Sequence, residues 1–264
     1  MAVGMAVVTG ASSGLGRELA RECAAHGLVP ILIARSVEGL TRTAAMMPDA
    51  DPVIIAADLA AEPERAAEQV LRAVELRAGT LCAILNNAGT GKQGDFKATG
   101  MQHITAQLRL NLEAVLRFSH VLLPELTAGG CILNVASTAG LCPGPGMAVY
   151  YASKAGLISW SRALEFELKP CGIRVTTFCP GPLQTDFVAK AGVKERSYLL
   201  RAPRPEQAAR IAVRRMLGRG GMLVYPLKFR LLGLLQRLVP MSLSIAMVQR
   251  EQRRRSKVPG ARHE

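Results

Sequence analysis

Residues 5–16 read MAVVTGASSGLG, in which an apolar run is followed by a turn that contains three glycines. A helical pattern begins at residue 14, so the turn joins a strand to a helix, the context in which such a glycine pattern is informative. Glycines let the backbone approach a pyrophosphate, and a helix N-terminus offers free N–H groups with a partial positive charge. We therefore expect a dinucleotide phosphate to bind at Gly10, Ser12, Ser13, Gly14, Leu15 and Gly16.

The strand and helix at residues 5–26 are the first of a series that runs along the chain. Apolar runs of four to seven residues alternate with longer segments of helical period, which is typical of β-α-β units and a parallel sheet. The pattern predicts strands at 5–9, 29–34, 53–57, 81–86, 131–136, 173–178 and 222–225, and helices at 14–26, 37–46, 63–78, 99–126, 150–169 and 205–218. The predicted fold class is α/β, a single doubly wound domain of Rossmann type whose seven-stranded parallel sheet has helices on both faces.

The end of the second predicted strand bears on which dinucleotide would bind. Residues 31–35 read ILIAR, whereas a site for NAD usually has an aspartate or glutamate here that binds the ribose hydroxyls. Arg35 can instead pair with a 2′-phosphate, and the hydroxyls of Ser12 and Ser13 can donate to the same group. The sequence thus predicts NADP(H) in preference to NAD(H), against the plainer alternative that Arg35 is a solvated loop residue.

A second motif, YYASK at residues 150–154, lies in a predicted helix, and Tyr150 is thirteen positions after Ser137. Tyr150 and Lys154 are four residues apart, so their side chains leave one helix face about a turn apart. The ammonium group can lower the phenol pKa from its usual value of about 10, which suits a tyrosine that exchanges a proton with a substrate oxygen. A lone tyrosine on a helix usually packs and a lone serine after a strand usually caps, but together these residues indicate a hydride-transfer site.

Further motifs follow in order, and with them the chain resembles the short-chain dehydrogenases and reductases over about residues 5–189. The segment 9–16 matches the TGxxxGxG turn of that family, and 86–89 matches its NNAG motif. The segment 180–185 resembles the PG motif that follows the sixth strand and holds the nicotinamide carboxamide. Asp58 resembles the aspartate that contacts adenine. Beyond the first turn, the cofactor-binding residues expected are Arg35, Asp58, Leu59, Asn87, Ala88, Gly89, Tyr150, Lys154, Pro180, Gly181, Leu183 and Thr185.

The resemblance also implies a catalytic set of Asn111, Ser137, Tyr150 and Lys154. Tyr150 would act as general acid in reduction and as base in oxidation, while Lys154 would lower its pKa and hydrogen-bond the nicotinamide ribose. Ser137 would hold and polarise the carbonyl oxygen, so Ser137 and Tyr150 are the predicted substrate-binding residues. Asn111 would position a water that connects Lys154 to solvent.

These motifs predict an NADP(H)-dependent oxidoreductase that interconverts a ketone or aldehyde with a secondary or primary alcohol. The pocket for this small-molecule substrate is expected to be lined by segments 90–98, 138–149 and 186–203. Apolar residues in these segments predict a lipophilic substrate; they are Met147, Phe187, Val188, Tyr198, Leu199 and Leu200. The alternative is a non-catalytic dinucleotide-binding sensor or a membrane-associated scaffold on the same fold, although neither has a chemical need for all four catalytic residues.

Composition indicates one domain in a reducing compartment. The chain has 264 residues, of which 49% are hydrophobic, and this is enough for one sizeable core. The six cysteines form no C-x-x-C pair, and the first apolar run is too short for a signal peptide, so a cytoplasmic location is expected. The four histidines are too scattered to predict a metal site.

The C-terminal part differs from the rest in charge. Residues 1–189 carry 15 Lys and Arg against 16 Asp and Glu, whereas 190–264 carry 18 against 4. Residues 227–248 are apolar, but Lys228, Arg230, Arg237 and Pro240 interrupt them before any run could span a bilayer.

We therefore expect a catalytic domain at 1–226 and a basic, apolar extension at 227–264. The extension could close the pocket, contact another subunit, remain solvated or lie on an anionic membrane. The charge predicts a peripheral position at the inner face of the membrane, and nucleic acid is the less favoured partner.

The predicted helix at 150–169 carries more apolar residues than one core face needs. The family resemblance implies that this helix and the helix at 99–126 pair across a two-fold axis. We therefore expect a homodimer or homotetramer.

Overall fold

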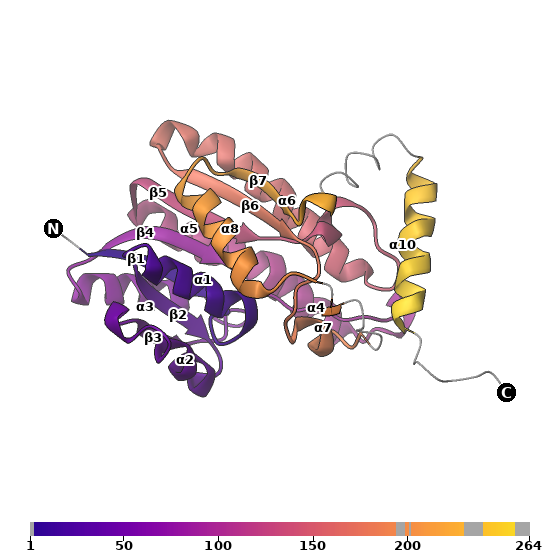
Figure 1. Ribbon diagram of the computed structural model, residues 1–264, viewed down its shortest axis with the longest axis horizontal. Coiled ribbons are helices and arrows are strands. Elements are labelled where there is room, and N and C mark those ends of the chain that lie inside the picture. Colours follow the sequence, from indigo (N-terminus) through magenta and orange to yellow (C-terminus); the bar gives the residue numbers. More distant parts are fainter. Residues whose placement is uncertain (1–2, 194–198, 201, 230–239, 257–264) are drawn as a thin grey trace.

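A computed structural model describes residues 3–193, 199–200, 202–229 and 240–256. Seven strands form one parallel sheet in the order β3-β2-β1-β4-β5-β6-β7 (Figure 1). Every predicted strand is present, which confirms the predicted fold class. The strands are β1 (Gly4–Thr9), β2 (Val29–Ala34), β3 (Val53–Ala56), β4 (Thr80–Asn86), β5 (Leu126–Val135), β6 (Arg174–Pro180) and β7 (Gly221–Tyr225).

Successive strand residues point alternately into two hydrophobic cores, one on each face of the sheet. Val8 and Leu32 pack on the face covered by α1, α2 and α8, whereas Val7 and Ile33 pack on the face covered by α3, α5 and α6. Burial on both faces explains why the strands read as continuous apolar runs. The covering helices are α1 (Gly14–Ala25), α2 (Val37–Ala44), α3 (Pro63–Leu76), α5 (Ala114–Leu122), α6 (Ala148–Glu167) and α8 (Pro205–Leu217).

The predicted helix at 99–126 is not one regular helix. It consists of α4 (Met101–Leu108), a π-helical turn at Arg109–Glu113, and α5. The turn surrounds Asn111, whose side chain is bonded to the backbone of Thr90 on a neighbouring loop. β5 starts at Leu126, five residues before the predicted 131, because Leu126 pairs with Leu81 ahead of a shift in register.

Short 3₁₀ turns connect several of these elements. The turn after β5 begins directly after Ser137, and the turn after α5 contains Pro124, which helps to end that helix. The 3₁₀ turns are Pro48–Ala50, Phe96–Ala98, Leu123–Glu125, Thr138–Leu141 and Lys169–Cys171.

The C-terminal helix α10 (Met241–Ser256) stands at the end of the molecule opposite the N-terminus (Figure 1). Within the apolar segment 227–248, residues 230–239 lie outside the described residues. In the part of the chain that is described, no helix has the length and apolar character needed to cross a bilayer. The six cysteines are free thiols.

Candidate active site

The candidate site lies at the carboxyl ends of β1 and β4, where the order of strands in the sheet reverses. Thr9 Oγ1 accepts hydrogen bonds from the backbone N–H groups of Asn87 at 2.8 Å and Ala88 at 3.0 Å. Asn87 Nδ2 donates to the Thr9 carbonyl at 2.8 Å. These bonds hold the glycine turn against the loop after β4, beside a cavity of about 860 Å³.

The glycine turn forms one end of this cavity, and its shape depends on glycine at two positions. Gly10 has φ of +68°, and a Cβ there would lie 2.8 Å from Asn87 Nδ2. A Cβ on Gly16 would lie 2.2 Å from the Gly10 carbonyl oxygen, so α1 packs directly on the turn. At the N-terminus of α1, Ser13 makes no capping hydrogen bond and the first turn has no acidic residue. This cradle fits an anion such as a dinucleotide pyrophosphate.

The residues after β2 and β3 form the rim of the cavity beside the glycine turn. Arg35 is exposed there, and Asp58 is exposed with its Oδ1 accepting from Ala60 N at 2.9 Å. Sequence reasoning missed Arg17, whose guanidinium donates to the Ser12 carbonyl at 2.9 Å and to Thr43 Oγ1 at 3.2 Å. The one indication of this role in the sequence is that Arg17 directly follows Gly16, the last glycine of the turn. Arg17 does not itself line the cavity but fixes Ser12 of the glycine turn, whereas Arg35 presents its guanidinium at the rim.

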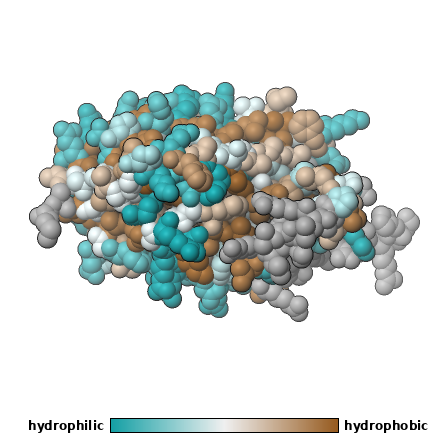
Figure 2. All heavy atoms as spheres, turned by 90° about the horizontal axis from the view of Figure 1, so that it is seen from above, coloured by the Kyte–Doolittle hydropathy of each residue, from teal (hydrophilic) through white to brown (hydrophobic). Residues whose placement is uncertain are grey.

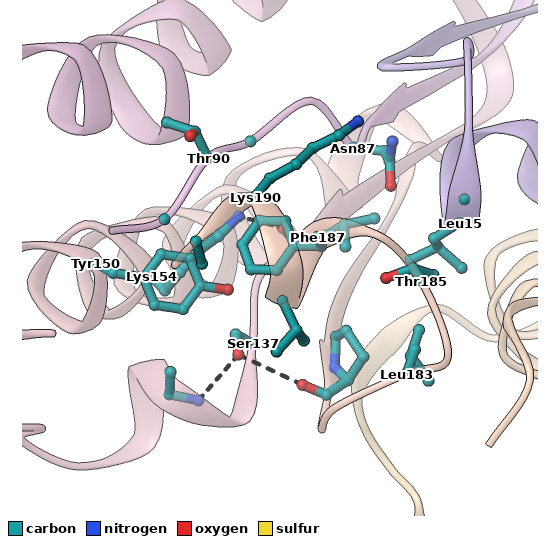
Figure 3. A pocket seen from close by; sticks show the side chains of 18 of the residues that line it. Leu15, Asn87, Thr90, Ser137, Tyr150, Lys154, Leu183, Thr185, Phe187 and Lys190 are labelled. Atoms are coloured by element: carbon teal, nitrogen blue, oxygen red, sulfur yellow. Dashed lines mark hydrogen bonds between the residues drawn. The ribbon is translucent and has the colours of Figure 1, made fainter. Parts of the chain in front are cut away.

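Ser137, Tyr150 and Lys154 meet at the other end of the cavity (Figure 3). Ser137 follows β5, and its Oγ accepts from Ala139 N at 3.1 Å and donates to the Pro180 carbonyl at 3.4 Å. Tyr150 and Lys154 lie on α6, and the Tyr150 ring is 5.7 Å from the Phe187 ring, centroid to centroid. Lys154 Nζ donates to the Val135 carbonyl at 2.8 Å.

Two of the titratable groups on α6, Tyr150 and Lys154, have shifted pKa values. Burial raises the pKa of the Tyr150 phenol to about 12, and a side-chain hydrogen bond with Ser137 opposes this shift. Burial lowers the pKa of Lys154 to about 8. The prediction that Lys154 lowers the Tyr150 pKa is therefore wrong for the net shift, because desolvation of the phenol outweighs the effects that favour its anion.

Asn111 does not line the cavity but is buried directly behind it. Its Oδ1 accepts from Thr90 N at 2.8 Å, and its Nδ2 donates to Thr90 O at 2.8 Å and to Ser153 Oγ at 3.0 Å. A Cβ on Gly89 would lie 3.2 Å from Asn111 Oδ1 and 3.5 Å from Lys154 Nζ, so both groups lie beside Gly89.

Sequence reasoning missed Thr90 and Ser153 as partners of Asn111. Ser153 Oγ also donates to the Tyr150 carbonyl at 2.8 Å, so it links Asn111 to the helix that carries Tyr150. Both residues could have been found from the sequence, because Thr90 directly follows the NNAG motif and Ser153 lies within YYASK.

The cavity brings together all the residues predicted to bind cofactor and substrate. Of the apolar residues predicted to line the substrate end, Met147, Phe187 and Val188 do so. Leu199 packs beside them without lining the cavity, and Leu200 is 83% exposed, so its prediction is wrong. Tyr198 lies outside the described residues.

Residues near the C-terminus also line the substrate end, a role that the sequence suggested only as one alternative for the extension. Apart from Phe229, they lie on α10, and they are Phe229, Met247, Val248, Glu251 and Gln252. Among the described residues, no group of three or more His, Cys, Asp or Glu side chains could hold a metal ion.

Comparison with known proteins agrees with this geometry. A family model described as short chain dehydrogenase matches residues 4–196. The chain belongs to the short chain dehydrogenase family. It is 28% identical over 212 residues to the meso-2,3-butanediol dehydrogenase of Serratia marcescens, with 78% of this chain and 84% of the relative covered. It is 34% identical over 225 residues to the very-long-chain 3-oxoacyl-CoA reductase of Mycosarcoma maydis, with 82% of this chain but 62% of the relative covered.

Solved structures of short chain dehydrogenases have the same fold. A short chain dehydrogenase from Burkholderia cenocepacia in complex with NADP gives a TM-score of 0.74 at 29% identity, with 84% of this chain and 95% of that chain covered. Because the relatives of this short chain dehydrogenase are named as dehydrogenases and reductases, the protein is an oxidoreductase.

Proposed function

We propose that this short chain dehydrogenase is an NADP(H)-dependent oxidoreductase that interconverts a lipophilic ketone or aldehyde with its alcohol. The observation that carries the proposal is that Ser137, Tyr150 and Lys154 line the same cavity as the glycine turn. Gly10, Gly14 and Gly16 would hold the pyrophosphate of the dinucleotide, while Gly181 and Thr185 would hold its nicotinamide end. When bound, the nicotinamide supplies or accepts the hydride.

Tyr150 is the proposed general acid in reduction and general base in oxidation. A pKa raised to about 12 keeps its phenol protonated at neutral pH, so the proton is present, and its transfer to a carbonyl oxygen requires that the phenolate be stabilised. Ser137 would donate a hydrogen bond to the same oxygen. Its present bond to the Pro180 carbonyl is long, at 3.4 Å, so exchanging it for a substrate oxygen costs little.

Lys154 would stabilise the phenolate that remains when Tyr150 gives up its proton. Asn111 would act with Lys154, because both groups lie beside Gly89 and the Thr90 and Ser153 bonds fix the Asn111 amide. We propose that this amide positions a water molecule through which Lys154 exchanges protons with solvent.

The rate of reduction is expected to fall as the pH rises through about 8. Burial lowers the Lys154 pKa to about 8, so the ammonium that stabilises the phenolate is present below this pH and is lost above it. The measurement is the steady-state kcat for carbonyl reduction across the pH range, with the affinity for NADPH measured in parallel. A kcat that stays constant well above the Lys154 pKa would contradict this role.

The cavity supports a lipophilic substrate. Met147, Phe187 and Val188 give apolar walls next to Tyr150, and one relative is named a very-long-chain 3-oxoacyl-CoA reductase. The proposed function is tested by following NADPH absorbance with a panel of aliphatic and aromatic ketones and aldehydes. No turnover of any carbonyl, under conditions in which NADPH binds, would reject it. A non-catalytic sensor is not favoured, because the similar proteins are named for dehydrogenase or reductase activity.

We further propose that the protein forms a homodimer or homotetramer through α5 and α6. Phe166 on α6 is 66% exposed, and Figure 2 shows hydrophobic residues exposed between hydrophilic ones on the face seen there. Light scattering at micromolar concentration should give at least twice the mass of one chain. A monomer under these conditions would contradict the proposal.

Finally, we propose that the protein is cytoplasmic. Residues 1–226 would form the catalytic domain, and the extension 227–264 would touch the inner face of the membrane. Helix α10 exposes Met241 and Leu243, which are 61% and 54% exposed, together with the exposed Arg250. Arg253, Arg254 and Arg255 follow in the sequence. Exposed apolar residues beside clustered arginines favour an anionic lipid surface.

The protein should sediment with anionic phospholipid vesicles at low salt and be released at high salt, whereas neutral vesicles should leave it in solution. Arg250→Gln should weaken this binding by about fivefold, since one basic residue near an anionic leaflet contributes ~1 kcal/mol. Binding to DNA but not to vesicles would contradict the membrane assignment, as would indifference to both.

A further inference from the structure

Helix α10 forms the outer wall of the substrate end of the cavity. Met247, Val248, Glu251 and Gln252 line the cavity together with Tyr151, which directly follows the proposed proton donor. The rings of Tyr150 and Tyr151 meet edge to face, with centroids 6.4 Å apart. A segment from the C-terminal part of the chain therefore reaches the catalytic end of α6.

A buried glutamine holds this wall in place. Gln252 is 5% exposed, and its Nε2 donates to the Tyr151 hydroxyl at 3.0 Å. Gln93 Nε2 donates to both the carbonyl oxygen and Oε1 of Gln252, at 3.4 Å each. Gln252 thus joins α10 to α6 and to the loop after β4.

No apolar side chain of α10 is fully buried among the residues whose burial is described. Among residues 241–252, whose burial is described, the two buried side chains are Ser244 and Gln252, and both are polar. Ser244 Oγ has no hydrogen-bond partner within the described part of the chain. The position of α10 therefore depends strongly on Gln252.

We propose that Gln252 is a positioning residue that determines substrate specificity, because its hydrogen bond to Tyr151 fixes α10 as the end wall of the substrate pocket. This inference rests on the proposed function. A straight apolar chain attached to the carbonyl would reach Met247 and Val248, and each methylene buried there adds about fourfold in affinity. A short ketone does not reach this wall. Gln252 therefore selects long-chain over short-chain carbonyl substrates.

The first test measures whether the contact holds the helix. Hydrogen exchange of the backbone amides in α10 is compared in full-length wild type, Gln252→Leu, Tyr151→Phe and the double variant. Tyr151→Phe should make α10 exchange roughly five- to tenfold faster, as expected for the loss of one buried hydrogen bond, and Gln252→Leu should do so at least as much because it also removes the bond from Gln93 to Oε1. The double variant should match Gln252→Leu, because both changes remove the same bond. Ser244→Ala is the matched control on the same helix, and it should leave the exchange unchanged.

The second test measures selectivity without turnover. Calorimetry with NADP⁺ present gives the Kd of butanone and of a long straight-chain methyl ketone. Gln252→Leu should weaken binding of the long ketone by roughly tenfold and leave butanone and NADP⁺ binding unchanged.

Unchanged exchange of α10 in both single variants would overturn the proposal, as would an equal loss of affinity for both ketones or no binding of the long ketone to wild type. If wild type binds the long ketone but does not reduce it with NADPH, the proposed function fails while the role of Gln252 in binding stands.

Discussion

Tyr150→Phe is expected to lower carbonyl reduction by roughly 10²–10⁴-fold while NADPH affinity and thermal stability stay close to wild type. The change removes only the hydroxyl that donates the proton and keeps the ring that packs on Phe187. Single-turnover kinetics with NADPH, together with a cofactor titration, measures both properties on the same preparation.

The control for this variant must be a tyrosine whose hydroxyl does not face the cavity. Tyr225→Phe is suitable because Tyr225 packs against the core and does not line the site. Tyr151→Phe is not neutral, since its hydroxyl accepts the hydrogen bond from Gln252. Turnover that survives in Tyr150→Phe but is lost in Tyr225→Phe or Tyr151→Phe would show that Tyr150 is not the acid.

Arg35→Ala should remove the preference for NADPH over NADH. A charge-assisted bond from the guanidinium to the 2′-phosphate is worth ~1.5–3 kcal/mol, which corresponds to roughly 10–150-fold in affinity. Arg35 lies at the rim of the cavity, and the strand that precedes it carries no carboxylate that would bind the ribose hydroxyls of NADH instead. Fluorescence titration of both cofactors with wild type and variant measures the ratio.

Arg72→Ala is the matched control, because Arg72 is exposed on α3 and does not line the cavity. It should leave both affinities unchanged. Equal affinities of the wild type for NADPH and NADH, or a preference that Arg35→Ala does not alter, would reject the assignment of Arg35.

The sheet and most of the site could be predicted because their determinants are local. Each strand is buried on both faces, so it reads as an apolar run, and parallel strands bring their carboxyl ends to one edge. Residues that follow β1, β4 and β5, such as Gly10, Asn87 and Ser137, must then come close together. All three line the same cavity in the structure.

The position of α10 and the pKa of Tyr150 could not be predicted, because both depend on tertiary contacts. The Gln252 to Tyr151 bond joins residues 101 positions apart, and nothing near Gln252 indicates its partner. The Tyr150 pKa is raised because the folded chain buries the phenol, whereas the spacing to Lys154 suggested only the opposite effect. Leu200 was misassigned for the same reason, since an apolar residue in a loop carries no sign of which way it faces.

Because residues 109–113 form a π-helical turn, the position of Asn111 depends on the number of residues in this segment. One residue more than a regular helix needs is accommodated there, with the Asn111 amide turned inward. A further inserted residue, with no wider turn to absorb it, would rotate α5 by about 100° relative to α4, whereas deleting the extra residue would restore a regular helix and remove the turn that directs Asn111 inward. Either Asn111 or the face of α5 that carries Phe118 and Leu122 would then point away from the core. Evolution can therefore exchange side chains along this helix more freely than it can change the number of residues between Leu108 and Ala114.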